Sequence, residues 1–144
     1  MTAVMKDTDA IKEKIYAKHG HDLYMRDMGL EILELREGYV KSRIPVKKEH
    51  LNSYGYVHGG VLYGFADVSA GLAASMCGYC VVTLEGSMHY LDPAEQTEYI
   101  YCEAEALREG KNMMFYHVRL TTDAGKAVDD GTFTFFNTHN PLPG

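Results

Sequence analysis

The chain has 144 residues and a mass of 16.1 kDa, a size that fits one domain spanning 1–144. Hydrophobic residues make up 46% of it and charged residues 24%, a composition that can bury a core and excludes a disordered chain. Lys and Arg number 14 against 20 Asp and Glu, so the net charge is −6. This acidic balance argues against a broad basic surface for nucleic acid or an anionic membrane, although a local basic pocket for a phosphorylated ligand stays open.

The cysteines and the first residues indicate a cytoplasmic protein. Three cysteines, Cys77, Cys80 and Cys102, are few and odd in number, which suits a reducing compartment. Residues 1–14 carry charges every few positions and contain no apolar run of the signal-peptide kind. The weakly polar stretch 56–84 contains Asp67, and a carboxylate at a membrane centre costs about 2.5–3.5 kcal/mol. We therefore expect a buried helix there and no membrane association.

The first third of the chain predicts a leading helix and then a hairpin. Within 1–20, helix-start residues stand at 7–9, helix formers follow, and Gly20 is a natural stop. From Leu30 the pattern changes to period two, in which apolar or small residues at 40, 42, 44 and 46 alternate with polar residues and proline. A turn at 36–38 joins this run to the preceding strand pattern at 30–35, so the two form a hairpin.

The segment 60–77 predicts a core helix, because nearly every face of it is apolar or small and such a helix is surrounded by other structure. From 81 to 137 the chain reads as four strands. Val82, Leu84, Met88 and Tyr90 are placed on one face of the first, and the last carries Phe133 and Phe135. The tail 140–144 is expected to be loose.

These elements predict an α+β fold in which a curved antiparallel sheet wraps around one long central helix, with a short N-terminal helix. A sheet that curls in this way covers one side of the helix. The rest of the helix surface needs a cover, and a second copy of the chain can supply it.

Asp67 is the residue in this helix that most needs explanation. Its neighbours Phe65, Ala66 and Val68 are apolar, and a buried unpaired carboxylate is costly. It is therefore either a hydrogen-bonded structural residue or a group poised for chemistry.

The entry to the same helix, His58-Gly59-Gly60, is a candidate oxyanion hole. Backbone N–H groups at a helix start are free to donate, and glycine lets a ligand approach closely. The alternative is a tight entry turn with His58 as a cap. Asp67 lies eight residues after Gly59, about 12 Å along a helix, too far for both to act on one carbonyl within one chain. If they cooperate, they do so across a twofold dimer.

The spacing of Asn52, His58-Gly59-Gly60 and Asp67 resembles that of the hotdog-fold acyl-CoA thioesterases, and among them the phenylacetate-pathway (PaaI-like) type. The segments 82–85, 88–94 and 131–135 are similar to the strands and the Pro-Ala turn of that family. The resemblance covers most of the chain from 52 to 137.

The resemblance implies hydrolysis of an acyl-CoA, with coenzyme A as part of the substrate and no separate cofactor or metal. Asp67 is then the general base or nucleophile, and the Gly59 N–H of the other subunit polarises the carbonyl. Asn52 and His58 orient the site or contact the thioester region, and Thr83 assists the water. Gly60 is assigned to substrate binding. Two further residues flank the turn at 109–110 and are either contacts for the coenzyme A phosphates or ordinary surface residues: Arg108 and Lys111.

Several alternatives stay open. One is a non-catalytic acyl-CoA-binding or sensing protein on the same fold, and another is a hotdog dehydratase or hydratase, for which no Asp-His pair is evident. Cys77 and Cys80 have redox spacing but follow a helix, where the dipole disfavours a thiolate. His19 and His21 make a weak metal site. The acyl group, the choice between dimer and tetramer, and the exact role of Asp67 are left undetermined by the sequence.

Overall fold

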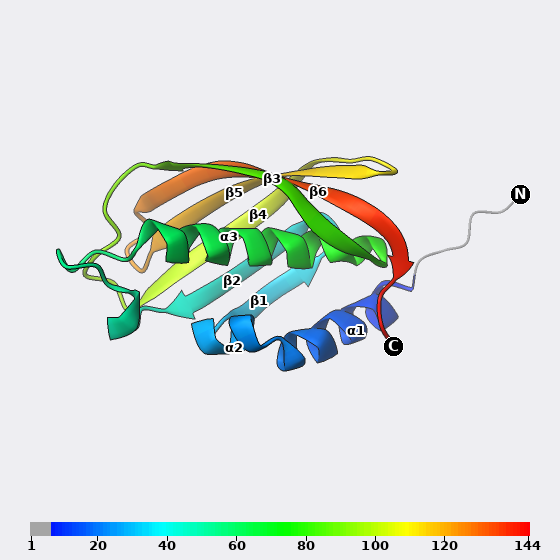
Figure 1. Ribbon diagram of the computed structural model, residues 1–144, viewed down its shortest axis with the longest axis horizontal. Helices are drawn as coiled ribbons and strands as arrows, with labels where there is room; N and C mark the ends of the chain where they lie inside the picture. The colour runs from blue at the N-terminus through cyan, green and yellow to red at the C-terminus, as the bar shows by residue number, and fades with distance from the viewer. Residues whose placement is uncertain (1–6) are drawn as a thin grey trace, which may run out of the picture.

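The computed structural model describes residues 7–144. A 14-residue helix and a short second helix precede a six-stranded sheet, and a long helix crosses the concave side of that sheet (Figure 1). The elements in chain order are α1 Thr8–His21, α2 Leu23–Met28, β1 Glu31–Arg36, β2 Tyr39–Pro45, the 3-10 turn η1 Lys48–His50, α3 Gly59–Ala74, the 3-10 turn η2 Ser75–Cys77, β3 Tyr79–Tyr90, β4 Tyr99–Glu109, β5 Met113–Thr122 and β6 Ala127–Pro141.

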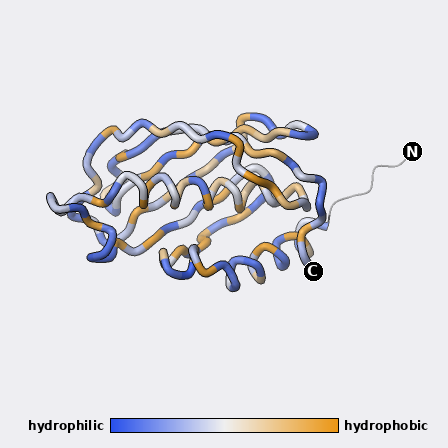
Figure 2. Tube along the Cα trace, viewed as in Figure 1, coloured by the Kyte–Doolittle hydropathy of each residue, from blue (hydrophilic) through white to orange (hydrophobic). Residues whose placement is uncertain are grey.

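All neighbouring strands are antiparallel, and their order across the sheet is β1-β2-β4-β5-β6-β3. The sheet curves around α3, as the sequence predicts, and β1 and β3 form its two edges (Figure 1). The hairpin predicted over 30–46 and the four later strands are confirmed. Hydrophobic and hydrophilic residues alternate along the strands (Figure 2), so one face of the sheet packs on α3 while the other faces solvent. The core residues nearest to complete burial include Val40, Ile44, Phe65, Ala70, Ile100, Tyr116, Val118 and Phe133.

A β-bulge in β3 corrects the predicted alternation of this strand. The register of β3 on β6 shifts between Thr83 and Glu85, so Leu84 is an extra residue with no partner position on β6. Val82 lies opposite Phe136 and faces outward, whereas Tyr90 lies opposite the buried Asp129 and faces α3. The prediction that Val82 shares a face with Met88 and Tyr90 is therefore wrong, because a bulge reverses the parity of every residue beyond it.

The central helix is covered on one side by the sheet, and its other side is only partly covered within the single chain. Its buried residues face the sheet, but Gly60 is exposed, and Tyr63, Asp67 and Gly71 are half-buried. The prediction that α3 is buried on every face is thus wrong for a single chain. The sequence analysis predicts that a second copy of the chain covers this open face. The stretch Gly59–Cys77 is long and apolar enough to cross a membrane by length and composition, yet its apolar side packs against the sheet as a core helix does.

Both ends of the chain differ from the expected pattern. Gly20 lies inside α1, and the leading segment forms two helices because the Asp22 side chain accepts a hydrogen bond from the Met25 N–H and starts α2. Gly29, at φ 75°, provides the left-handed stop. The tail predicted to be loose from Asn140 is partly ordered, since β6 runs to Pro141 and Leu142 is only 5% exposed.

Asp129 on β6 is a carboxylate buried in the core. Its side chain faces α3 between Leu120 of β5 and Tyr90 of β3, and it is 0% exposed. Neither carboxylate oxygen has a hydrogen-bond partner within residues 7–144. This burial raises the pKa of Asp129 to about 7. An unfolded Asp ionises near pH 4, so the folded state loses stability as the pH rises from about 4 to about 7.

We predict that Asp129→Asn removes this loss. Between pH 4 and pH 7.5 the free energy of unfolding of the wild type should fall by about 2–4 kcal/mol more than that of the variant, measured by urea denaturation at each pH. Asp130→Asn is the matched control, because Asp130 faces outward and pairs with His117 at 3.0 Å. Equal pH dependence in wild type and Asp129→Asn would contradict the assignment.

Candidate active site

The loop before α3 is folded around Asn52. Its side-chain Oδ1 accepts hydrogen bonds from the N–H of Tyr54 at 2.9 Å and of Tyr56 at 3.0 Å, while its own N–H donates to the Tyr56 carbonyl at 2.7 Å. The His58 N–H donates to the His50 carbonyl at 2.9 Å and holds the end of the loop. Asn52 therefore determines where α3 begins, through local side-chain to backbone bonds.

The first turn of α3 presents two N–H groups that have no acceptor in the described part of the chain, those of Gly59 and Gly60. The His58 carbonyl takes up the next two N–H groups, of Val61 and Leu62. His58 is the N-cap residue of α3, as the alternative of an entry turn with a His58 cap predicts, but within residues 7–144 it caps through its carbonyl and its exposed side chain makes no capping hydrogen bond. A free pair of helix-start donors is suited to a developing negative charge.

Tyr90 at the end of β3 is a site residue that the sequence reasoning missed. Its hydroxyl donates to the Gly59 carbonyl at 3.0 Å, and its ring lies 3.3 Å from where a Gly59 Cβ would be. The contact joins residues 31 positions apart, so no local pattern could reveal it. It fixes the helix turn that carries the unpaired N–H groups.

Asp67 lies in the middle of α3 on its open face. The Thr83 hydroxyl of β3 donates to Asp67 Oδ1 at 2.7 Å. Asp67 is half-buried rather than enclosed in the core, which removes the cost expected from the sequence for a carboxylate among apolar neighbours. The structure thus brings together Asp67 and Thr83, which lie 16 residues apart in the chain.

The predicted site residues fall into two separate hollows within one chain. Asp67 and Thr83 line a cavity of about 160 Å³ between α1, α2, α3 and β3, here called the Asp67 cavity. Asn52, Gly59 and Tyr90 line a second hollow of about 340 Å³ at the start of α3. The two linings share no residue. The eight-residue separation along α3 places Asp67 about 12 Å along the helix axis from Gly59 of the same chain.

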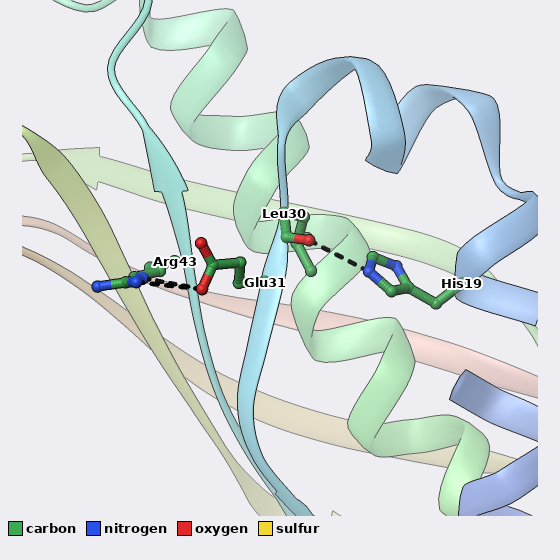
Figure 3. Close-up of polar contacts among 4 residues, drawn as sticks. All are labelled: His19, Leu30, Glu31 and Arg43. Carbon is green, nitrogen blue, oxygen red and sulfur yellow. Dashed lines mark hydrogen bonds and ion pairs between the residues drawn. The ribbon is translucent and has the colours of Figure 1, made fainter. Parts of the chain in front are cut away.

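The remaining candidates lie outside these hollows. Arg108 and Lys111 are exposed at the β4–β5 hairpin and line neither hollow. Cys77 and Cys80 form no disulfide in the described chain. His19 has its Nε2 3.1 Å from the Leu30 carbonyl (Figure 3), and no group of three His, Cys, Asp or Glu side chains within 7–144 is placed to hold a metal ion.

The chain thus combines an apolar helix on a curved antiparallel sheet with a carboxylate on the open face of that helix and free N–H groups at its start. The thioesterase superfamily model matches residues 54–128. Human acyl-coenzyme A thioesterase 13 is 30% identical over 88% of this chain and 94% of its own length. A hypothetical thioesterase with coenzyme A from Streptococcus pneumoniae has a TM-score of 0.74 at 31% identity, over 78% of this chain and 88% of that one.

The E. coli PaaI protein from the phenylacetic acid degradation operon has the same fold, with a TM-score of 0.89 at 19% identity over 96% of this chain and 100% of that one. This confirms the hotdog fold. The chain belongs to the thioesterase superfamily, and it is a PaaI-like hotdog thioester hydrolase.

We predict that Asn52→Ala loosens the loop before α3. Two N–H groups lose their acceptor, which should lower the free energy of unfolding by about 1–3 kcal/mol and speed hydrogen exchange at Tyr54 and Tyr56. Asn52→Asp keeps an acceptor oxygen in place and should preserve both exchange rates. Unchanged exchange in the alanine variant would show that Asn52 does not hold the loop.

Proposed function

We propose that this chain hydrolyses an acyl-CoA thioester to a free acid and coenzyme A. The observation that carries the proposal is the arrangement along α3, where a half-buried carboxylate and a pair of free N–H donors lie on one helix. The names of the relatives support the substrate class, since one is an acyl-coenzyme A thioesterase and another structure was solved with coenzyme A.

Asp67 acts on the thioester carbonyl carbon, either directly or through a water that it deprotonates. In the water route, hydroxide adds to the carbonyl carbon, the bond to sulfur breaks, and the proton that Asp67 removed from water passes to the thiolate of coenzyme A. In direct attack, Asp67 displaces the thiolate and forms an acyl anhydride, which water cleaves to the free acid and the Asp67 carboxylate while a proton passes to the thiolate. Thr83 donates a hydrogen bond to Asp67 and so holds the carboxylate in one orientation. The second carboxylate oxygen of Asp67 is left for the water or the substrate.

The Gly59 N–H, with that of Gly60 beside it, stabilises the negative charge that develops on the carbonyl oxygen. Tyr90 positions this turn through the Gly59 carbonyl. The exposed His58 side chain stands at the same turn and is proposed to contact the thioester region.

The complete site requires two chains. Asp67 of one chain and Gly59 of the other come together when two α3 helices lie antiparallel about a twofold axis. Two surfaces of the single chain suit this arrangement, the open face of α3 and the outer edge of β3, whose Val82 and Leu84 are 50% and 52% exposed. We therefore propose a closed homo-oligomer, and we place Arg108 and Lys111 as candidate contacts for the coenzyme A phosphates.

We predict that Asp67→Asn lowers turnover at least about a hundredfold, because shape and the acceptor for Thr83 are kept while basicity is lost. Free-thiol release from aryl, short, medium and long acyl-CoAs measures it, with thermal unfolding to confirm the fold. Retained turnover in the variant would overturn the role of Asp67. A wild type that releases no thiol but is stabilised against heat by acyl-CoA would indicate the binding protein instead.

We predict that Gly59→Pro lowers turnover by about a hundredfold to a thousandfold. Gly59 is the first helical residue and His58 before it is extended, so proline fits while the N–H donor is removed. Gly59→Ala is the matched control, because it adds a Cβ next to Tyr90 but keeps the donor.

Co-expression of Gly59→Pro with Asp67→Asn chains tests the two-chain site. A mixed dimer contains one intact site of two, formed by the unmodified Asp67 and Gly59 of different chains, and should have about half of wild-type activity. Because random pairing of equal amounts makes about half of the dimers mixed, the whole mixture should recover about a quarter of wild-type activity. No recovery in a mixture shown by mass spectrometry to contain mixed dimers would contradict a site shared between chains.

A further inference from the structure

The Asp67 cavity is walled by the N-terminal helices. Ile15 of α1, Met25 of α2 and Gly71 of α3 line it, together with Phe135 of β6 and Leu142. The same helices also contribute polar lining residues: Lys18, His19 and Asp22. Ile15, Phe135 and Leu142 are 2%, 2% and 5% exposed, so the cavity ends against the hydrophobic core. All of these residues except Gly71 lie outside 54–128, the part matched by the thioesterase superfamily model.

Defined contacts hold this wall in place. His19 of α1 points to the Leu30 carbonyl, 3.1 Å from its Nε2, just before β1 begins (Figure 3). Its Nδ1 lies 3.2 Å from Met25 Sδ, which joins α1 to α2. Glu31, the next residue along, binds Arg43 of β2 at 3.1 Å and anchors β1 to the sheet (Figure 3). The Tyr24 hydroxyl occupies the place where a Cβ of Gly64 would lie, so α2 also packs closely on α3.

We propose that α1 and α2 form the wall of the acyl pocket and that Ile15 and Met25 limit the length of the acyl group. This proposal rests on the proposed function of Asp67. A thioester carbonyl held at Asp67 directs its acyl chain into the cavity that Asp67 lines.

The size of the cavity indicates the substrate class. Its volume of about 160 Å³ is well below the roughly 300–1,000 Å³ of pockets that bury drug-sized ligands. The enzyme should therefore prefer acyl groups of short to medium length, and long-chain acyl-CoAs should be poor substrates.

Variants that enlarge the Asp67 cavity and a variant that narrows it test whether the wall limits the length of the acyl group. Ile15→Ala and Met25→Ala enlarge the cavity and should raise the ratio of kcat/KM for dodecanoyl-CoA to that for butyryl-CoA about tenfold. Gly71→Ala narrows it and should lower the same ratio several-fold. The added Cβ would lie 3.5 Å from the Phe135 ring, an ordinary contact, and alanine favours the helix, so this variant should fold even if Ile15→Ala does not.

Ile11→Ala is the control for Ile15→Ala. It makes the same change one turn earlier in α1, where Ile11 packs near Gly78 and does not line the cavity, and its ratio should match the wild type. Ratios that do not move in opposite directions for the enlarged and narrowed variants would overturn the proposal.

Dissociation constants of the corresponding non-hydrolysable acyl-CoA thioethers, measured by calorimetry, separate this proposal from the proposed function. A wild type that hydrolyses none of the acyl-CoAs overturns the hydrolase assignment. The thioether affinities then still decide whether Ile15, Met25 and Gly71 set the acyl length.

Discussion

The structure depends on one constraint, the packing of an apolar helix against a sheet that can cover only one of its sides. The sheet-facing side of α3 is closed by large side chains such as Phe65 and Leu62, while the other side carries Gly60, Asp67 and Gly71. Small residues on that side leave room for other backbone and for a ligand. A carboxylate is tolerable there because it is not enclosed, and it keeps a hydrogen bond from Thr83.

The edge strand β3 connects this helix to both halves of the site. Thr83 bonds Asp67 in the middle of α3, and Tyr90 bonds Gly59 at its start. The two residues are seven positions apart and would face opposite sides of a regular strand. The bulge at Leu84 adds one residue and turns both toward α3, so an irregularity in β3 is what lets a single strand orient the carboxylate and the N–H donors together.

Period-two patterns and the core helix were sufficient to predict the fold, and the spacing of His58, Gly59 and Asp67 was sufficient to select candidate residues, because these signals are local. The misses arise from contacts between distant segments. Tyr90 meets Gly59 across 31 residues, the bulge depends on pairing with β6, and Leu142 is buried because its N–H meets the Gly78 carbonyl. Asp129 stands next to Asp130 in the sequence, and only the strand register shows that Asp129 faces the core.

Because Asp67 and Gly59 lie at different places along α3, selectivity for the acyl group and catalysis can change independently. In the proposed assembly one chain supplies Asp67 together with the wall of α1 and α2, and the other supplies the donors of Gly59. The acyl pocket is then built within one chain, and only the reacting carbonyl spans the interface. Changes at Ile15 or Met25 can alter the acyl group without disturbing the N–H donors, whereas any change that shifts one α3 helix along the other separates the donors from the carboxylate.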